Sequence, residues 1–409
     1  MSTLKTNNIQ HVDLSEPSIL INNDGSVSIA GTMTYEDVTS VDAVGIITGR
    51  VLVDAQKQVH VGTGVSVKAG GLNVTAGITT VQALQATTGT FSADGSFNSI
   101  SIGKGANSVG GNTVLGESAL DAATTGGFNV AIGRNSLTEL TTGTNNSALG
   151  NNALKENTTA SNNTAIGNDA LKANTTGANN TALGAYALDA ANAGNNTAIG
   201  YEALTDNTTG TQNVGVGYFA LGNNTTANNN TALGYIALSA NTTGSENVAI
   251  GGEALEKNTT ADSNTAVGFR ALEETTTGSS NTAVGRDCLE ANTTGASNTA
   301  VGRDALSSNT TASNNTALGI SALLTNSTGG ENTAVGSYAL DASNSTGNTA
   351  VGRSALSALT TGSYNVAVGR KALESQTTAS DNVAIGNLAL AVNTTGTDNV
   401  AVGANALDA

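Results

Sequence analysis

A five-residue pattern recurs from residue 112 to the C-terminal end of the sequence. It consists of Asn, then Thr or Val, a residue that is usually Ala, a branched apolar residue, and Gly, as in residues 163–167. The closing glycine occurs eighteen times between Gly116 and Gly403, in fifteen steps of 17 residues and two of 16. A short fixed period of this kind is typical of a solenoid, in which each repeat packs only on its neighbours.

The repeat length decides which kind of solenoid is possible. Seventeen residues are too few for a pair of packed helices, because helical repeats need more than about thirty. Within the pentad, the second and fourth residues share one face of an extended strand, and the asparagine, alanine and glycine share the other. We therefore predict an all-β fold for residues 112–409: a parallel β-solenoid, or β-roll, with one coil of about 17 residues per repeat.

The two faces of the predicted strand differ in size. One face carries branched side chains, and the opposite face admits little besides Ala or Gly. A solvated face would be free to carry long polar side chains, so we expect the strand to be covered closely on both sides. One thin coil supplies one cover. The second is expected from another chain, which predicts a homotrimer with its strands about a common axis.

The second half of the repeat contains a leucine that is present in all eighteen copies. Stacked leucines are expected to be the main stabiliser of each coil, at roughly 1.5–3 kcal/mol each. The pattern does not distinguish a short second strand from a single helical turn here. The recurring pentad asparagine predicts an internal amide ladder. Examples of these predicted structural ladders are Leu154, Leu171, Leu188, Leu204, Asn163 and Asn180.

The repeat closes with Asn-Thr-Thr-Gly, whose residue types favour turns. In five copies, at positions 160, 227, 261, 312 and 379, the glycine is alanine. A left-handed conformation would cost alanine about 1 kcal/mol or more, so this turn is not expected to require a positive φ.

The sequence before residue 112 has a different character. Residues 1–64 are predicted to form a small β-rich module, in which 18–21 and 26–29 are two strands joined by a tight turn. Residues 65–111 contain β-prone pieces too short to make their own core. We expect three chains to intertwine there as a β-prism-like stalk, with residues 98–103 as a shortened first coil.

Composition narrows the range of partners. The formal net charge is −16, which predicts repulsion from nucleic acids and anionic bilayers. No 18-residue apolar run occurs, so no membrane span is expected, and no apolar segment typical of a signal peptide follows Met1. The single cysteine, Cys288, excludes an intrachain disulfide and is predicted to be a buried substitute for alanine.

The repeats resemble two kinds of known protein. The pentads are similar to the head repeats of trimeric autotransporter adhesins, which form a trimeric left-handed parallel β-roll. The full 17-residue unit looks more like repeats of bacteriophage tail-fibre proteins. Residues 1–11 and 34–48 are similar to the starts of structural proteins from tailed phages of marine cyanobacteria. This resemblance implies a virion fibre attached through its N-terminal part to a baseplate, collar or other fibre protein.

No catalytic, cofactor-binding or metal-binding pattern is found, and we predict that the chain is not an enzyme. The residue after the pentad glycine, however, forms a stripe along the predicted fibre. Aromatic rings bind sugars and arginines bind carboxylates, so this stripe is a candidate for glycan contact. Alternatively, stacked like residues cover the coil and pair with Asp287, Asp304 or Glu253. The stripe consists of Tyr201, Tyr218, Tyr235, Phe269, Arg286, Arg303, Arg353 and Arg370.

These observations predict a structural virion fibre, an extracellular appendage that gives reach and contacts the host surface. The alternative is a bacterial cell-surface or extracellular adhesive fibre. A polysaccharide-cleaving fibre is disfavoured because no paired carboxylates stand out from the repeat. A further fibre protein is expected to be able to seat on the C-terminal coil, where the strand edge is open.

Overall fold

The computed structural model describes residues 8–9, 19–21, 23, 27–29, 95–97 and 100–408. The chain divides into two units, residues 1–85 and 86–409, which are considered separately. Much of the predicted N-terminal module, including residues 34–48, and most of the predicted stalk lie outside the described residues.

In the first unit, three short strands form an antiparallel sheet in the order β1-β2-β3. They are β1 (Asn8–Ile9), β2 (Ile19–Ile21) and β3 (Val27–Ile29). Ile21 pairs with Val27 and Ile19 with Ile29, which confirms the predicted pairing of the two segments. The additional strand β1 was not predicted.

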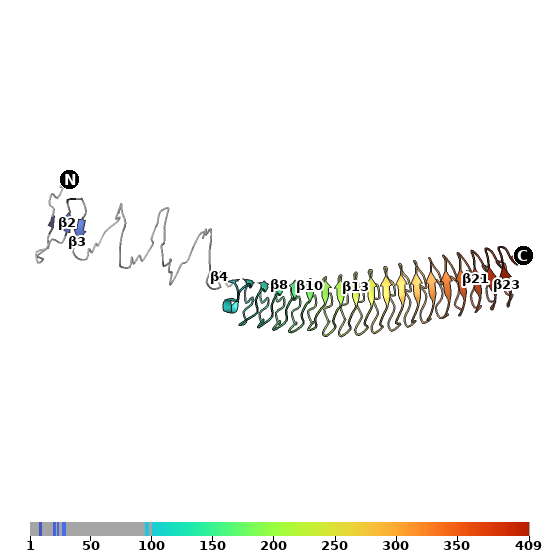
Figure 1. The fold of residues 1–409 in the computed structure, drawn as a ribbon, viewed down its shortest axis with the longest axis horizontal. Helices are drawn as coiled ribbons and strands as arrows, with labels where there is room; N and C mark the ends of the chain where they lie inside the picture. The colour runs from blue at the N-terminus through green and yellow to red at the C-terminus, as the bar shows by residue number, and fades with distance from the viewer. Residues whose placement is uncertain are drawn as a thin grey trace. The chain divides into compact units, whose positions relative to one another are not determined.

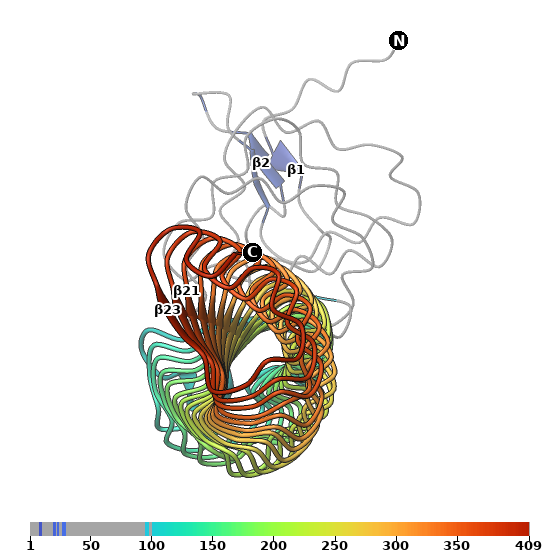
Figure 2. The same ribbon diagram turned by 90° about the vertical axis from the view of Figure 1, so that its right-hand side faces the viewer.

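In the second unit, one short strand per repeat stacks on the next to form a long parallel ladder (Figure 1). Pairing is in register, so that Thr164 lies beside Thr181 and Ala165 beside Ala182. Viewed along the stack, successive coils turn gradually relative to one another (Figure 2). The prediction of an all-β parallel solenoid is confirmed. Its strands are β6 (Thr113–Gly116), β7 (Val130–Ile132), β8 (Ser147–Leu149), β9 (Thr164–Ile166), β10 (Thr181–Leu183), β11 (Thr197–Ile199), β12 (Val214–Val216), β13 (Thr231–Leu233), β14 (Val248–Ile250), β15 (Thr265–Val267), β16 (Thr282–Val284), β17 (Thr299–Val301), β18 (Thr316–Leu318), β19 (Thr333–Val335), β20 (Thr349–Val351), β21 (Val366–Val368), β22 (Val383–Ile385) and β23 (Val400–Val402).

The start of the ladder differs from the prediction. Strands β4 (Gly95–Phe97) and β5 (Ile100–Gly103) form a hairpin, and β5 pairs antiparallel with β6. The expectation that residues 98–103 form a shortened first coil is therefore wrong. A short helical turn, η1 (Ala106–Ser108), connects β5 to β6, and the hairpin occupies the backbone edge that the first coil would otherwise leave open.

Each strand buries its small face inside the coil. Ala165 is fully buried, whereas Ile166 on the outward face is 37% exposed. The interior cover is a leucine of the same chain: a Cβ added at Gly215, which occupies the alanine position of its coil, would lie 3.3 Å from the Leu204 side chain. Thus the coil itself covers the small face. The branched face is the one left open, and the predicted trimer stays a prediction.

The leucine segment is neither a strand nor a helical turn. All eighteen leucines have a positive φ, between 48° and 55°, including Leu154 at 51° and Leu171 at 51°. Their amides still bond the neighbouring coil, as Leu171 N–H does to Ala187 O at 3.0 Å. This conformation costs an L-residue about 1–2 kcal/mol and is most unfavourable for β-branched side chains. This cost fits the presence of leucine, and never isoleucine or valine, at this position in all eighteen coils, although Ile236 adopts a φ of 47° at a corner position.

The predicted amide ladder is present. The backbone N–H of Asn163 donates to Asn146 Oδ1 at 3.0 Å, and Asn180 N–H donates to Asn163 Oδ1 at 2.8 Å. The Asn163 side-chain amide donates in turn to Gly177 O at 2.9 Å. Each buried asparagine thus pairs its own polar atoms and ties consecutive coils together, which offsets the cost of placing an amide in the interior.

In each of the two 16-residue coils, an asparagine side chain replaces one backbone acceptor in the hydrogen-bond ladder between coils. In a regular coil, the amides of Thr158 and Thr159 both donate to the Thr175 carbonyl. In the first short coil, Asn192 Oδ1 replaces that carbonyl and accepts from the amides of Thr175 and Thr176 at 3.1 and 2.9 Å. Asn344 does the same in the second short coil, at 3.0 and 2.8 Å. One deleted backbone residue is therefore compensated by one asparagine.

The closing turn does not use a left-handed residue at its Gly/Ala position, as predicted: neither Gly143 nor Ala160 has a positive φ. Space between coils is nevertheless limiting, since a Cβ added at Gly143 would lie 2.2 Å from the Ala160 carbonyl oxygen. Across the solenoid, no two neighbouring coils both carry a side chain at this position.

Candidate corner surface

The most variable outward-facing positions of the solenoid are the two residues that follow the pentad glycine, here called the corner positions. The glycine itself is fixed by geometry. Gly167 has φ +142°, and an added Cβ would lie 2.3 Å from the Gly184 carbonyl oxygen. The chain turns there, and because the strands are in register, corner residues of consecutive coils stack in a column. A side chain at a corner position is therefore adjacent to the corner side chains of the preceding and following coils.

In the middle of the fibre the first corner position is a tyrosine ladder. Tyr201 and Tyr218 stack with ring centroids 5.6 Å apart and planes 8° from parallel. Tyr218 and Tyr235 stack at 5.5 Å and 17°. Hydrogen bonding to the Glu202 carboxylate raises the pKa of the Tyr201 hydroxyl. The structure thus brings together three of the predicted glycan-contact residues, but it directs the faces of the rings toward one another.

Two aromatic residues that the sequence pattern did not single out adjoin the tyrosine ladder from the second corner position. Tyr186 meets Tyr201 edge to face, with centroids 5.9 Å apart, and Phe219 lies beside Tyr218 at 6.5 Å. The repeat period could have identified Tyr186. It is the second residue after Gly184, and Tyr201 is the first residue after Gly200, so the two lie at adjacent corner positions of consecutive coils. Aromatic side chains in these two adjacent columns form one cluster.

Phe269 is separated from this cluster. Gly252 occupies the intervening corner position, so the tyrosine ladder ends at Tyr235. The guanidinium of Arg270 lies 5.3 Å from the centroid of the Phe269 ring. Arg270 also contacts the carboxylates of Glu253 and Glu273, each at 3.7 Å, and bonds to Glu290.

The predicted arginines fall into two pairs of consecutive coils. Arg286 bonds Asp287 at 2.9 Å, and Arg303 bonds Asp304 at 3.1 Å, as the alternative interpretation anticipated. Arg370 donates to Asn387 Oδ1 at 3.0 Å. The side chains of Arg286 and Arg303 are 63% and 57% exposed, so these surface ion pairs leave their guanidinium groups largely accessible to solvent.

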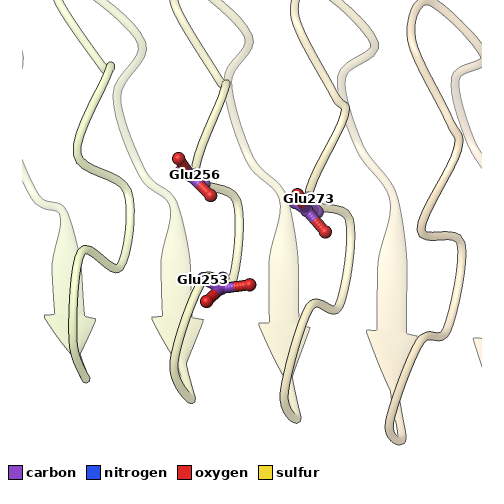
Figure 3. A group of neighbouring side chains, drawn as sticks. All are labelled: Glu253, Glu256 and Glu273. Carbon is purple, nitrogen blue, oxygen red and sulfur yellow. The ribbon is translucent and has the colours of Figure 1, made fainter.

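A group of three glutamates that the sequence pattern did not single out lies near Arg270. Glu253, Glu256 and Glu273 come from two neighbouring coils and place one oxygen each within 4.8 Å of one another (Figure 3). Burial raises the pKa of both Glu256 and Glu273, and Arg270 and Lys257 oppose this at Glu273. The sequence spacing could have predicted this group, because Glu253 and Glu256 are three residues apart and Glu256 and Glu273 are one 17-residue coil apart. Since Arg270 pairs with Glu253 and Glu273, and Lys257 also lies 4.0 Å from Glu273, we assign the group to ion pairing.

Other candidate chemistry lies in the interior. Asn157, which begins an Asn-Thr-Thr triplet that matches the N-glycosylation acceptor pattern, is fully buried and accepts from the Ala160 amide at 3.0 Å. Cys288 is fully buried, as predicted, and burial raises its pKa to about 12. Asn157 therefore stabilises the closing turn, and Cys288 packs in the core of the coil.

Comparison of the chain with protein-family models, with curated proteins and with solved structures finds no match. Within the described part of the chain, no helix is long and apolar enough to cross a membrane. The class that the fold defines is a regular β-solenoid of 17-residue coils, consistent with a repeat fibre. Among the coils of this chain, the interior leucine and asparagine positions stay nearly constant, whereas the corner positions vary from coil to coil.

Proposed function

We propose that this chain is a structural fibre of a phage particle, attached through residues 1–64 and projecting the solenoid of residues 112–409 outward. The observation that carries the proposal is the in-register parallel ladder, which continues without interruption from β6 to β23. Eighteen coils at about 4.8 Å each give a rod of about 85 Å. A rod of this kind supplies reach and rigidity, and its corner positions supply variable surface chemistry.

We further propose that three copies pack through the outward strand face. That face comprises the second and fourth pentad residues, which are uncharged in all eighteen coils. Leu183 is 44% exposed and Leu233 47% exposed in the single chain. Covering the remaining surface of such residues contributes roughly 0.7–1.4 kcal/mol each. Solvated sheet faces ordinarily carry charges, so a long uncharged face supports a partner that covers it.

The partners follow from this arrangement. The N-terminal module would bind a baseplate, collar or other fibre protein, and the C-terminal coil could seat another fibre protein. The corner column would contact a host surface glycan. The sequence resemblance to structural proteins of tailed phages supports the virion location. No role as an enzyme is proposed.

Locating the protein tests the function. Purified phage particles and host envelope fractions are compared by quantitative mass spectrometry, and the particles are labelled with gold-conjugated antibody against the solenoid. We expect a fixed copy number per particle, in multiples of three, and labelling of an appendage. Recovery only in cell envelopes would support the alternative, a bacterial adhesive fibre, and overturn the virion assignment.

A further inference from the structure

The corner column contains a break that lies between two aromatic rings. Residues 235, 252 and 269 are 17 apart, and β13, β14 and β15 pair in register, so these three positions stack. Tyr235 and Phe269 carry rings, and Gly252 between them carries no side chain. Coils rise by about 4.8 Å, so the two ring positions are roughly 10 Å apart. That spacing accommodates one further ring stacked between them.

Tyr235 presents an uncovered face to this break. Its other face stacks on Tyr218, with centroids 5.5 Å apart. Exposure rises along the ladder toward the break, from 45% at Tyr201 to 49% at Tyr218 and 57% at Tyr235. Within the ladder, by contrast, each internal ring face is occupied by a neighbouring ring. The break is therefore where the column can receive a ligand face to face.

Phe269 forms the opposite side. Its ring atoms Cδ2 and Cε2 lie 3.5 and 3.7 Å from the place where a Cβ of residue 252 would be, which is ordinary van der Waals contact. A ring that replaces the side chain missing at 252 would thus meet Phe269 directly. Polar groups border the same place, because Glu253 follows Gly252 and its carboxylate lies 3.7 Å from Arg270 Nε.

We propose that the break at Gly252 binds one pyranose ring of a surface glycan. The C–H faces of the sugar would stack on Tyr235 and Phe269, and Glu253 and Arg270 would bond its hydroxyl groups. The charged pair favours a sugar over an aromatic side chain of a protein partner, since a purely aromatic ring offers no hydroxyls to either charge. This inference rests on the proposed function only for the source of the glycan.

The test uses the intact purified chain and a surface array of defined hexose, hexosamine and hexuronic acid oligosaccharides, with hits measured by titration calorimetry. Gly252→Tyr fills the break with a side chain that the preceding coil already carries, and Gly252 is outside the left-handed region, so the coil should fold. Ser337→Tyr adds the same ring at another corner position as the matched control. Tyr235→Leu removes one stacking face.

Gly252→Tyr is expected to lower affinity at least tenfold, Tyr235→Leu by about tenfold, and Ser337→Tyr not at all. If the whole aromatic column bound glycan, Gly252→Tyr would extend it and affinity would be kept or raised, which would overturn the proposal. Failure of every oligosaccharide to bind, or selective binding of a tryptophan-containing peptide, would also overturn it. These outcomes leave the fibre assignment standing, because that assignment depends on where the protein is found.

Discussion

The left-handed leucine column gives the sharpest prediction about the coil. Leu356 and Leu359 belong to one coil, and both are fully buried. Leu356 has φ 52°, whereas Leu359 is outside the left-handed region. In an ordinary core, Leu→Ile costs less than about 1.5 kcal/mol. At Leu356 the new β-branch adds backbone strain of about 1–3 kcal/mol. Leu356→Ile should therefore cost about 2–4 kcal/mol, and Leu359→Ile below about 1.5 kcal/mol.

Native-state hydrogen exchange measured by mass spectrometry is the appropriate assay, because stacked repeats open locally. Amides of this coil and its two neighbours should exchange about 5- to 140-fold faster in Leu356→Ile than in Leu359→Ile, because the added strain is about 1–3 kcal/mol and 1.4 kcal/mol corresponds to a factor of ten. Leu356→Met, which like leucine is unbranched at Cβ, is the control and should resemble Leu359→Ile. Equal exchange in the two isoleucine variants would refute the argument that φ selects leucine.

Three other perturbations test separate parts of the coil. Asn192→Ala should expose the two amides it bonds in the preceding coil and speed their exchange about tenfold, with a smaller effect for Asn192→Asp; unchanged protection would show that water replaces the side chain equally well. Gly143→Ala should be destabilising by about 1–3 kcal/mol in thermal unfolding, because the new Cβ would meet the Ala160 carbonyl oxygen and the Leu140 side chain; unchanged stability would contradict this close approach of neighbouring coils. For Cys288, the pKa is about 12 in the folded chain against 9.0 for an ordinary thiol, so above pH 9 the unfolded chain releases a proton that the folded chain retains. Stability of the wild type should thus fall more steeply than that of Cys288→Ala as pH rises from 9 toward 12, and parallel pH profiles would show that the thiol is not buried.

Much of this architecture could be predicted because the repeat averages over eighteen copies. The period identified the coil, and the alternation in the pentad identified which strand face is small. The leucine conformation could not be predicted, since a positive φ is rare for leucine and contradicts its propensity. Residues 98–103 misled the prediction because an antiparallel strand and a parallel one share the same alternation, and only pairing distinguishes them.

The corner surface was predicted as a column but not as a set of distinct sites. Stacking of Tyr201 on Tyr218 follows directly from the period. The site at Gly252 could not be predicted in this way. A glycine contributes no side chain, and its position becomes informative only when the rings of the coils on either side are located. Likewise, the cluster around Arg270 depends on side chains from three coils, whose directions the spacing alone does not give.

The trimer remains the most consequential element of the account, because the uncharged strand face is open in the single chain. Sedimentation equilibrium of the full-length protein under native conditions measures it directly. We predict one folded species with three times the chain mass of 40.2 kDa at micromolar concentration. A folded, soluble species of 40.2 kDa across the concentration range would contradict the account.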